Sequence, residues 1–149
     1  MSEKILRYEP WFYILAILVA VAFRMVNLTS LPLSDFEASE ALNAFHLASG
    51  SQPVSGNQPL YTLITSSLFF IFGSSDFLAR FLPVLAGCAL VFLPLLMRNE
   101  LGKLPAIILT FGMAIDPALV TLSRQAGSVM PAMVLTLAAI CFAWKKELQ

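Results

Sequence analysis

Charge is scarce in this chain. Only 12% of its 149 residues are Asp, Glu, Lys or Arg, whereas 58% are hydrophobic. About a quarter of the residues in a soluble domain are charged, so the composition excludes an ordinary soluble domain and predicts an integral membrane protein. The formal net charge is zero. The chain therefore has no overall basic field of the kind that recruits nucleic acid, and we expect no nucleic-acid partner.

Cysteine and histidine are also few. Cys88 and Cys141 both lie inside apolar runs, where cysteine behaves as a small hydrophobe, so we expect no disulfide framework. His46 is the single histidine, and no second one completes a zinc-like ligand set. We predict no metal site in the chain and leave a divalent metal requirement open. Residues 1–149 show no repeat or linker and are treated as a single membrane domain.

Four apolar segments have lengths close to those of membrane spans. They are residues 10–26, 77–97, 104–122 and 129–144. The first is expected to be a retained anchor, because bulky Phe23 and Arg24 stand where a signal peptide would have small residues; Arg24 should snorkel to the membrane surface. The run 59–72 is shorter and typical of a surface helix. Asp116–Pro117 is expected to break the third span.

The positive residues predict the topology. If 59–72 stays on the surface, the positive residues divide unequally between the two sides of the membrane. One side has Lys4, Arg7, Arg98, Lys103, Lys145 and Lys146, and the other has Arg24, Arg80 and Arg124. By the positive-inside rule both termini are then cytoplasmic, and residues 27–76 form one external loop that carries two surface helices. A spanning 59–72 would reverse this bias. The fold class is therefore an all-α polytopic membrane protein with about four transmembrane helices.

The external loop contains an acidic stretch. Residues 34–49 have the pattern of an amphipathic helix, and Ser34 with Glu37 fits a capping box at its start. Asp35 and Glu37 could serve this helix start alone, or they could be functional. Glu40 is expected to be a solvated residue on the polar face, opposite an apolar face with Leu42 and Phe45. A carboxylate at this place could deprotonate a hydroxyl.

Several short motifs occur in a fixed order. They are Leu-Pro-Leu-Ser-Asp-Phe-Glu (31–37), Asn-Gln-Pro-Leu-Tyr (57–61), Ile-Phe-Gly-Ser-Ser-Asp-Phe-Leu-Ala-Arg-Phe (71–81), Leu-Met-Arg-Asn-Glu-Leu-Gly (96–102) and Asp-Pro-Ala-Leu-Val-Thr-Leu-Ser-Arg (116–124). From about Pro10 to Trp144, the chain resembles the N-terminal part of GT-C glycosyltransferases. The nearest type is glycosyltransferase family 39, with protein O-mannosyltransferases and lipid A aminoarabinose transferases. The family's greater length implies an N-terminal fragment or a reduced relative.

The resemblance implies a function. It implies transfer of a sugar from a polyprenyl-phosphate donor to a hydroxyl of a protein, lipid or glycan acceptor, on the external face of the plasma membrane or, in a eukaryote, of the endoplasmic reticulum membrane. Asp35 is the first candidate for the catalytic base and Glu37 the second. The spacing Asp-Phe-Glu, in place of the family's Asp-Glu, leaves open which carboxylate faces the acceptor. The implied substrate-binding residues are Arg80, Arg124, Gln58 and Tyr61. The family's acid before Met130–Pro131 is replaced by Val129.

Other roles stay open for these residues and for the chain. Arg80 could pair with Asp76 at i, i+4, and Arg124 could anchor a loop. Tyr61 suits a membrane interface. The whole chain could be a non-catalytic scaffold with a reduced GT-C fold, or it could need a membrane-protein partner that supplies further helices. A small transporter is disfavoured, because the acids gather in one external loop instead of mid-span.

Overall fold

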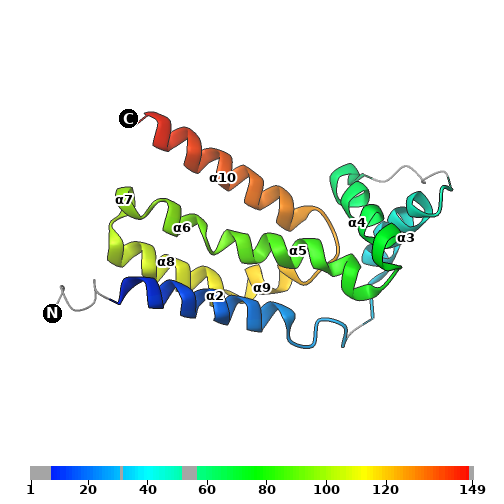
Figure 1. Cartoon of the computed structure of the whole chain (residues 1–149), viewed down its shortest axis with the longest axis horizontal. Helices are drawn as coiled ribbons and strands as arrows, with labels where there is room; N and C mark the ends of the chain where they lie inside the picture. The colour runs from blue at the N-terminus through cyan, green and yellow to red at the C-terminus, as the bar shows by residue number, and fades with distance from the viewer. Residues whose placement is uncertain (1–7, 31, 52–56, 148–149) are drawn as a thin grey trace.

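The computed structural model describes residues 8–30, 32–51 and 57–147, and Figure 1 shows their arrangement. The described part of the chain is helical and has no strand, which confirms the predicted all-α class. Its helices are α2 (Glu9–Met25), α3 (Asp35–Ala48), α4 (Pro59–Phe72), α5 (Asp76–Leu90), α6 (Leu93–Leu96), α7 (Arg98–Leu101), α8 (Lys103–Ile115), α9 (Pro117–Ser123) and α10 (Val129–Glu147).

Four rods make up the body of the molecule. They are α2, α5 with α6, α8 with α9, and α10; α3 and α4 lie together beyond one end of the rods (Figure 1). We call this end the α3–α4 end. By length and composition, Asp76–Leu96 could cross a membrane, and the bent pair α8–α9 would be a second such span if counted as one. The rods match the four segments predicted from the sequence, and their crossing of a membrane stays a prediction.

α2 and α8 run parallel. At one end the Glu9 carboxylate pairs with the ammonium of Lys103 at 3.3 Å and with the Arg98 guanidinium at 3.7 Å. At the other end Arg24 reaches Ala114. Between these contacts the helices meet through small buried residues, including Ala16, Ala20, Ala106, Thr110 and Ala114. Small side chains let two helices approach closely, which is how helices associate without a hydrophobic driving force in lipid.

Charged residues are found at both ends of the rods. Arg98 and Lys103 contact Glu9 at the start of α2, whereas Arg80 and Arg124 lie at the α3–α4 end with the end of α2. The two ends of the described chain both lie at the end of the rods that is opposite α3 and α4 (Figure 1). Lys4 and Arg7 fall outside the described residues. This arrangement places both ends of the described chain at the same end of the rods as Arg98 and Lys103.

The third rod is bent by 56° between α8 and α9. Asp116 caps α9, because its Oδ1 accepts a hydrogen bond from the main-chain N–H of Leu119 at 2.9 Å. Pro117 has no N–H and cannot continue the helix. The predicted break at Asp116–Pro117 is therefore confirmed, and the capping bond gives Asp116 a local structural role.

Arg24 does not snorkel, contrary to the sequence-based expectation. Its side chain has no exposed surface, and its guanidinium donates to the main-chain oxygens of Met113 and Ala114 at 3.1 Å each. The expectation was wrong because Arg24 lies near the end of its own helix but beside the broken end of another. There, carbonyl groups replace the water that a snorkelling side chain would seek.

Gly87 makes room for this contact. A Cβ atom at residue 87 would lie 2.5 Å from the Cβ of Ser123 and 2.9 Å from Nε of Arg24. We predict that Gly87→Ala lowers the free energy of unfolding by about 1–3 kcal/mol, because α5 must move away from α9.

Gly112→Ala is the matched control, because nothing lies within 4 Å of a Cβ at that helical position. It should be neutral or stabilise by up to about 1 kcal/mol through helix propensity. Unfolding of both variants in detergent micelles measures the difference. Equal effects of the two substitutions would contradict the close approach at Gly87.

Candidate functional site

The acidic stretch begins α3 as predicted. Oγ of Ser34 accepts a hydrogen bond from the N–H of Glu37 at 3.4 Å, and the N–H of Ser34 donates to Oε2 of Glu37 at 2.9 Å. These two bonds form the capping box that the sequence indicated. Asp35 is the first residue of α3 and is exposed. Ser34 and Glu37 therefore cap the start of α3, and Asp35 is accessible to a ligand.

Glu37 is the centre of a buried ion pair with Arg80. Oε2 of Glu37 lies 3.1 Å from Nη2 of Arg80, and Oε1 lies 3.2 Å from Nε. Both residues are 6% exposed. The two contacts are side by side, which is the strong fork-like arrangement of an arginine and a carboxylate. Sequence spacing had suggested Asp76 as a partner for Arg80, but no ion pair between them is found among the described residues.

The same ion pair ties the linker between α2 and α3 to α5. Arg80 donates from Nη1 to the main-chain oxygen of Leu28 at 2.8 Å and from Nη2 to that of Pro32 at 3.2 Å. A buried arginine needs acceptors for its donors, because an unsatisfied buried charge is costly. Arg80 therefore fixes the path of the chain as it leaves α2.

The loop between α9 and α10 is held by α3 and α4. The N–H of Ala126 donates to Oε1 of Glu37 at 2.7 Å, and the N–H of Ser128 donates to Oε1 of Gln58 at 2.6 Å. Gly127 lies between these two amides with φ +156°, close against the Gln58 side chain. The predicted substrate-binding residue Gln58 is thus 9% exposed and engaged with this loop.

The contacts of Glu37 govern its titration. Burial alone would raise the pKa of its carboxyl, but the hydrogen bonds from Arg80, Ser34 and Ala126 outweigh burial and hold the pKa at about 2. Glu37 is therefore ionised at neutral pH and is a weak base. This environment distinguishes it from Asp35, which lies two residues earlier and is exposed.

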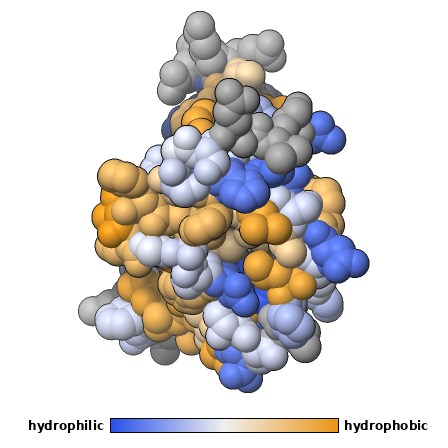
Figure 2. Space-filling view, turned by 90° about the vertical axis from the view of Figure 1, so that its right-hand side faces the viewer, coloured by the Kyte–Doolittle hydropathy of each residue, from blue (hydrophilic) through white to orange (hydrophobic). Residues whose placement is uncertain are grey.

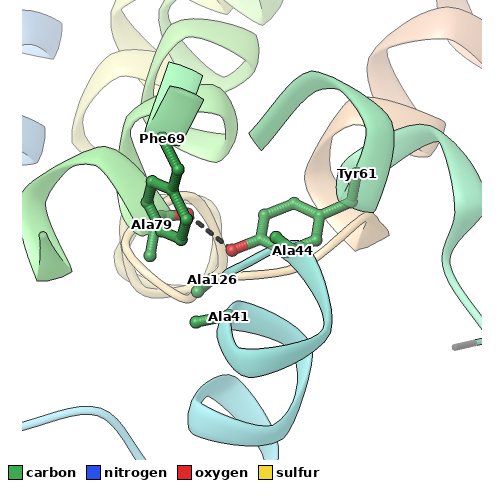
Figure 3. Close-up of a cluster of buried hydrophobic side chains, with 6 residues drawn as sticks. All are labelled: Ala41, Ala44, Tyr61, Phe69, Ala79 and Ala126. Atoms are coloured by element: carbon green, nitrogen blue, oxygen red, sulfur yellow. Dashed lines mark hydrogen bonds between the residues drawn. The ribbon is translucent and has the colours of Figure 1, made fainter. Parts of the chain in front are cut away.

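Tyr61 is buried in the contact between α3, α4 and α5. Its ring has no exposed surface, and its hydroxyl donates to the main-chain oxygen of Ala79 at 2.8 Å, as Figure 3 shows. Ala41, Ala44, Phe69 and Ala126 surround the contact. Burial raises the pKa of Tyr61 to about 12, so the hydroxyl stays a hydrogen-bond donor.

The predicted faces of α3 are wrong in one respect. Glu40 is 5% exposed, whereas Leu42 and Phe45 are 53% and 43% exposed. The buried face of α3 consists of carboxylates and alanines, which pack on α4 and α5, and the large apolar residues face outward. A solvated polar face is the rule in water; at a membrane surface, apolar side chains can face lipid instead. Figure 2 shows orange and blue patches interspersed at this end.

A cavity of about 690 Å³ opens beside the ion pair. Its polar wall includes Ser30, Ser34, Arg80, Thr121, Arg124 and Gln125. Arg124 is partly exposed and anchors the loop as the sequence suggested, since it donates to the main-chain oxygens of Phe23 at 3.1 Å and Asn27 at 2.8 Å. The structure thus brings Glu37, Arg80 and Arg124 to one cavity and places Ser34, the neighbour of Asp35, on its rim.

Some site residues could not be singled out from the sequence. Thr121 and Gln125 line the cavity, but isolated polar residues between two apolar segments gave no signal of this. The amides of Ala126 and Ser128 are main-chain N–H groups, which every residue type except proline could supply. Within the described residues, no group of three or more His, Cys, Asp or Glu side chains could hold a metal ion.

Apolar rods, charged ends and a polar cavity at one end define a helical membrane protein with a site at its surface. The sequence model of the dolichyl-phosphate-mannose-protein mannosyltransferase family matches residues 33–149. The chain therefore belongs to this family, whose kind of function is that of a membrane mannosyltransferase, and the resemblance to family 39 is confirmed. Comparisons with curated proteins and with solved structures gave no match.

Acid should weaken the α3–α4 end through Glu37. Because the pKa of this carboxyl is lower in the folded chain (about 2) than its ordinary value of 4.5, its contribution is complete above about pH 4.5 and is lost as the pH falls toward 2. A shift of this size corresponds to about 3 kcal/mol. Unfolding of the detergent-solubilised protein between pH 6 and 2 measures the loss.

Glu37→Gln should flatten this pH dependence and lower stability at neutral pH by about 3–5 kcal/mol, because Arg80 loses its charged partner. Glu100→Gln, at an exposed residue of α7, is the control and should leave the profile unchanged. A wild-type profile that persists in Glu37→Gln would show that another group is responsible.

Proposed function

We propose that this chain provides the catalytic carboxylate and part of the donor site of an inverting glycosyltransferase. The donor is a polyprenyl-phosphate sugar, and the acceptor is a hydroxyl of a protein, lipid or glycan on the external face. Family membership supports the class of reaction. The observation that carries the proposal is the cavity lined by Arg80, Arg124 and Ser34, because Ser34 directly precedes the exposed Asp35 at the start of α3.

The two carboxylates suit different tasks. A general base must be reachable by the hydroxyl whose proton it takes. Asp35 is exposed, whereas Glu37 is buried, with three different donors on its oxygens and a pKa of about 2. We assign the base to Asp35 and the organisation of the site to Glu37. This choice between the two predicted candidates rests on their environments.

The reaction then needs one base and a site for the leaving phosphate. Asp35 takes the proton of the acceptor hydroxyl, the oxygen forms a bond to the anomeric carbon, and the bond from that carbon to the phosphate oxygen breaks. The polyprenyl phosphate leaves with the bonding electrons. Positive groups placed where this charge develops stabilise the transition state.

The two arginines of the cavity contribute unequally. Arg80 gives its hydrogen bonds to Glu37 and to the linker after α2, so it supplies positive charge to the wall and holds its shape. Arg124 is partly exposed, and its guanidinium donates to the main-chain oxygens of Phe23 and Asn27. We assign the direct phosphate contact to Arg124. Gln58 and Tyr61 act by holding α4 against the α9–α10 loop and α5.

The proposed base is tested by Asp35→Asn. Transfer of labelled mannose from polyprenyl-phosphate mannose should fall by about 10²–10⁴-fold, the usual contribution of a general base, while expression and thermal stability stay unchanged. Asp76→Asn is the matched control, since Asp76 is also an exposed carboxylate in the first turn of a helix.

The assay uses the full protein in lipid. A wild-type transfer rate in Asp35→Asn would overturn the assignment of the base to Asp35. A wild-type chain that transfers no sugar, yet co-purifies with a larger membrane protein, would support the scaffold alternative instead.

We also propose that the α3–α4 end lies outside the membrane and that both termini are cytoplasmic. The positive-inside rule supports it, as does the position of Arg98 and Lys103 beside Glu9 at the opposite end. Residues 27–76 then form the external loop, with α3 and α4 on the membrane surface. The plasma membrane, or the endoplasmic reticulum membrane of a eukaryote, is the proposed location.

Two cysteine variants test this orientation. In a chain with Cys88 and Cys141 replaced, Asn57→Cys should react with an impermeant maleimide on intact cells, because it is exposed at the α3–α4 end. Asn99→Cys, exposed in α7, should react only after permeabilisation. The reverse labelling pattern would overturn the topology.

A further inference from the structure

Arg24 is a buried cation with which no carboxylate of the described residues pairs. Its side chain is fully buried at the end of α2, within a predicted span. Among the described residues, Arg24 forms no ion pair, and its Nε has no hydrogen-bond partner. A charged residue inside a membrane segment is costly and is kept where it has a specific task.

The acceptors of Arg24 identify that task. In an unbroken helix the oxygen of Met113 would accept the N–H of residue 117, and the oxygen of Ala114 would accept the N–H of residue 118. Residue 117 is proline and has no N–H, and the helix ends at Ile115. The guanidinium donates to these two oxygens, from Nη2 to Met113 and from Nη1 to Ala114, at 3.1 Å each.

We infer that Arg24 is a positioning residue that replaces the hydrogen bonds lost at Pro117 and so fixes the 56° bend between α8 and α9. Its positive charge also suits the negative end of the α8 dipole. Without such donors, two carbonyl groups would be left unsatisfied in a buried place, and the bend would not be held.

The bend sets the position of the cavity wall. α9 directly follows it and ends at Ser123, and the next residue is Arg124. Thr121 and Arg124 line the cavity. Ser123 is fully buried beside Gly87, so α9 is packed in the bent position. The link from Arg24 to sugar transfer rests on the proposed function, whereas its link to the bend does not.

A double-mutant cycle tests the bend directly. Arg24→Leu removes the donors, and Pro117→Ala restores the N–H that the helix lacks. Each single variant should lower the thermal midpoint in detergent by about 10 °C, because one leaves carbonyl groups without donors and the other takes the Met113 and Ala114 oxygens away from the buried guanidinium. The double variant has neither defect, so its loss should be clearly smaller than the sum of the two.

Arg98→Leu is the matched control. Arg98 is half-exposed and pairs with Glu9 at 3.7 Å, so its effect should be the same with and without Pro117→Ala. Additive losses for Arg24→Leu and Pro117→Ala would overturn the inference, because packing alone predicts additivity. Should Arg24→Leu fail to accumulate, accumulation of the double variant supports the inference, and failure of the double variant overturns it.

A second readout follows the bend itself. Spin labels at residues 108 and 118, both exposed, should give one narrow distance in the cysteine-replaced parent. The distance should broaden in Arg24→Leu and lengthen in Pro117→Ala. An unchanged distribution in both variants would overturn the inference whether or not the chain transfers sugar, so this result separates it from the proposed function.

Discussion

The ion pair between Glu37 and Arg80 is the interaction on which the α3–α4 end depends. It joins the linker after α2, the start of α3, the first turns of α5 and the loop before α10. A buried ion pair is stable only when its remaining donors and acceptors are satisfied. Main-chain groups of Leu28, Pro32, Ser34 and Ala126 meet that need. The ion pair therefore holds these four segments in place, and the four segments in turn stabilise the ion pair.

The helices were largely predictable because their signals are local. A capping box marks the start of α3, proline and glycine mark the ends of α4, and apolar runs of suitable length mark the rods. The ion pair was not predictable, because its partners are 43 residues apart, and helix spacing suggested Asp76 for Arg80. For the same reason Arg24 was expected to seek water, although its acceptors come from another helix.

The burial of α3 could not be derived from its pattern alone. A period of 3.6 residues separates the apolar side from the polar side, but it does not say which side meets the protein. Here the polar side with Glu37 and Glu40 faces inward. The candidate site was therefore only partly visible in the sequence: its acids and arginines stood out, while their division into buried and accessible groups came from the packing of α3 on α4 and α5.

Glu37 accepts the N–H of a residue that lies 89 positions later in the chain. The α3–α4 end therefore cannot reach its final form while the ribosome is still making the segment between Glu37 and Ala126. Ala126 and Ser128 must first be synthesised, and the rods of α8–α9 and α10 must be placed beside those of α2 and α5–α6. Until then, Glu37 and Gln58 lack partners that they have in the finished protein. Assembly of the site is thus one of the last events in the biogenesis of this part of the chain.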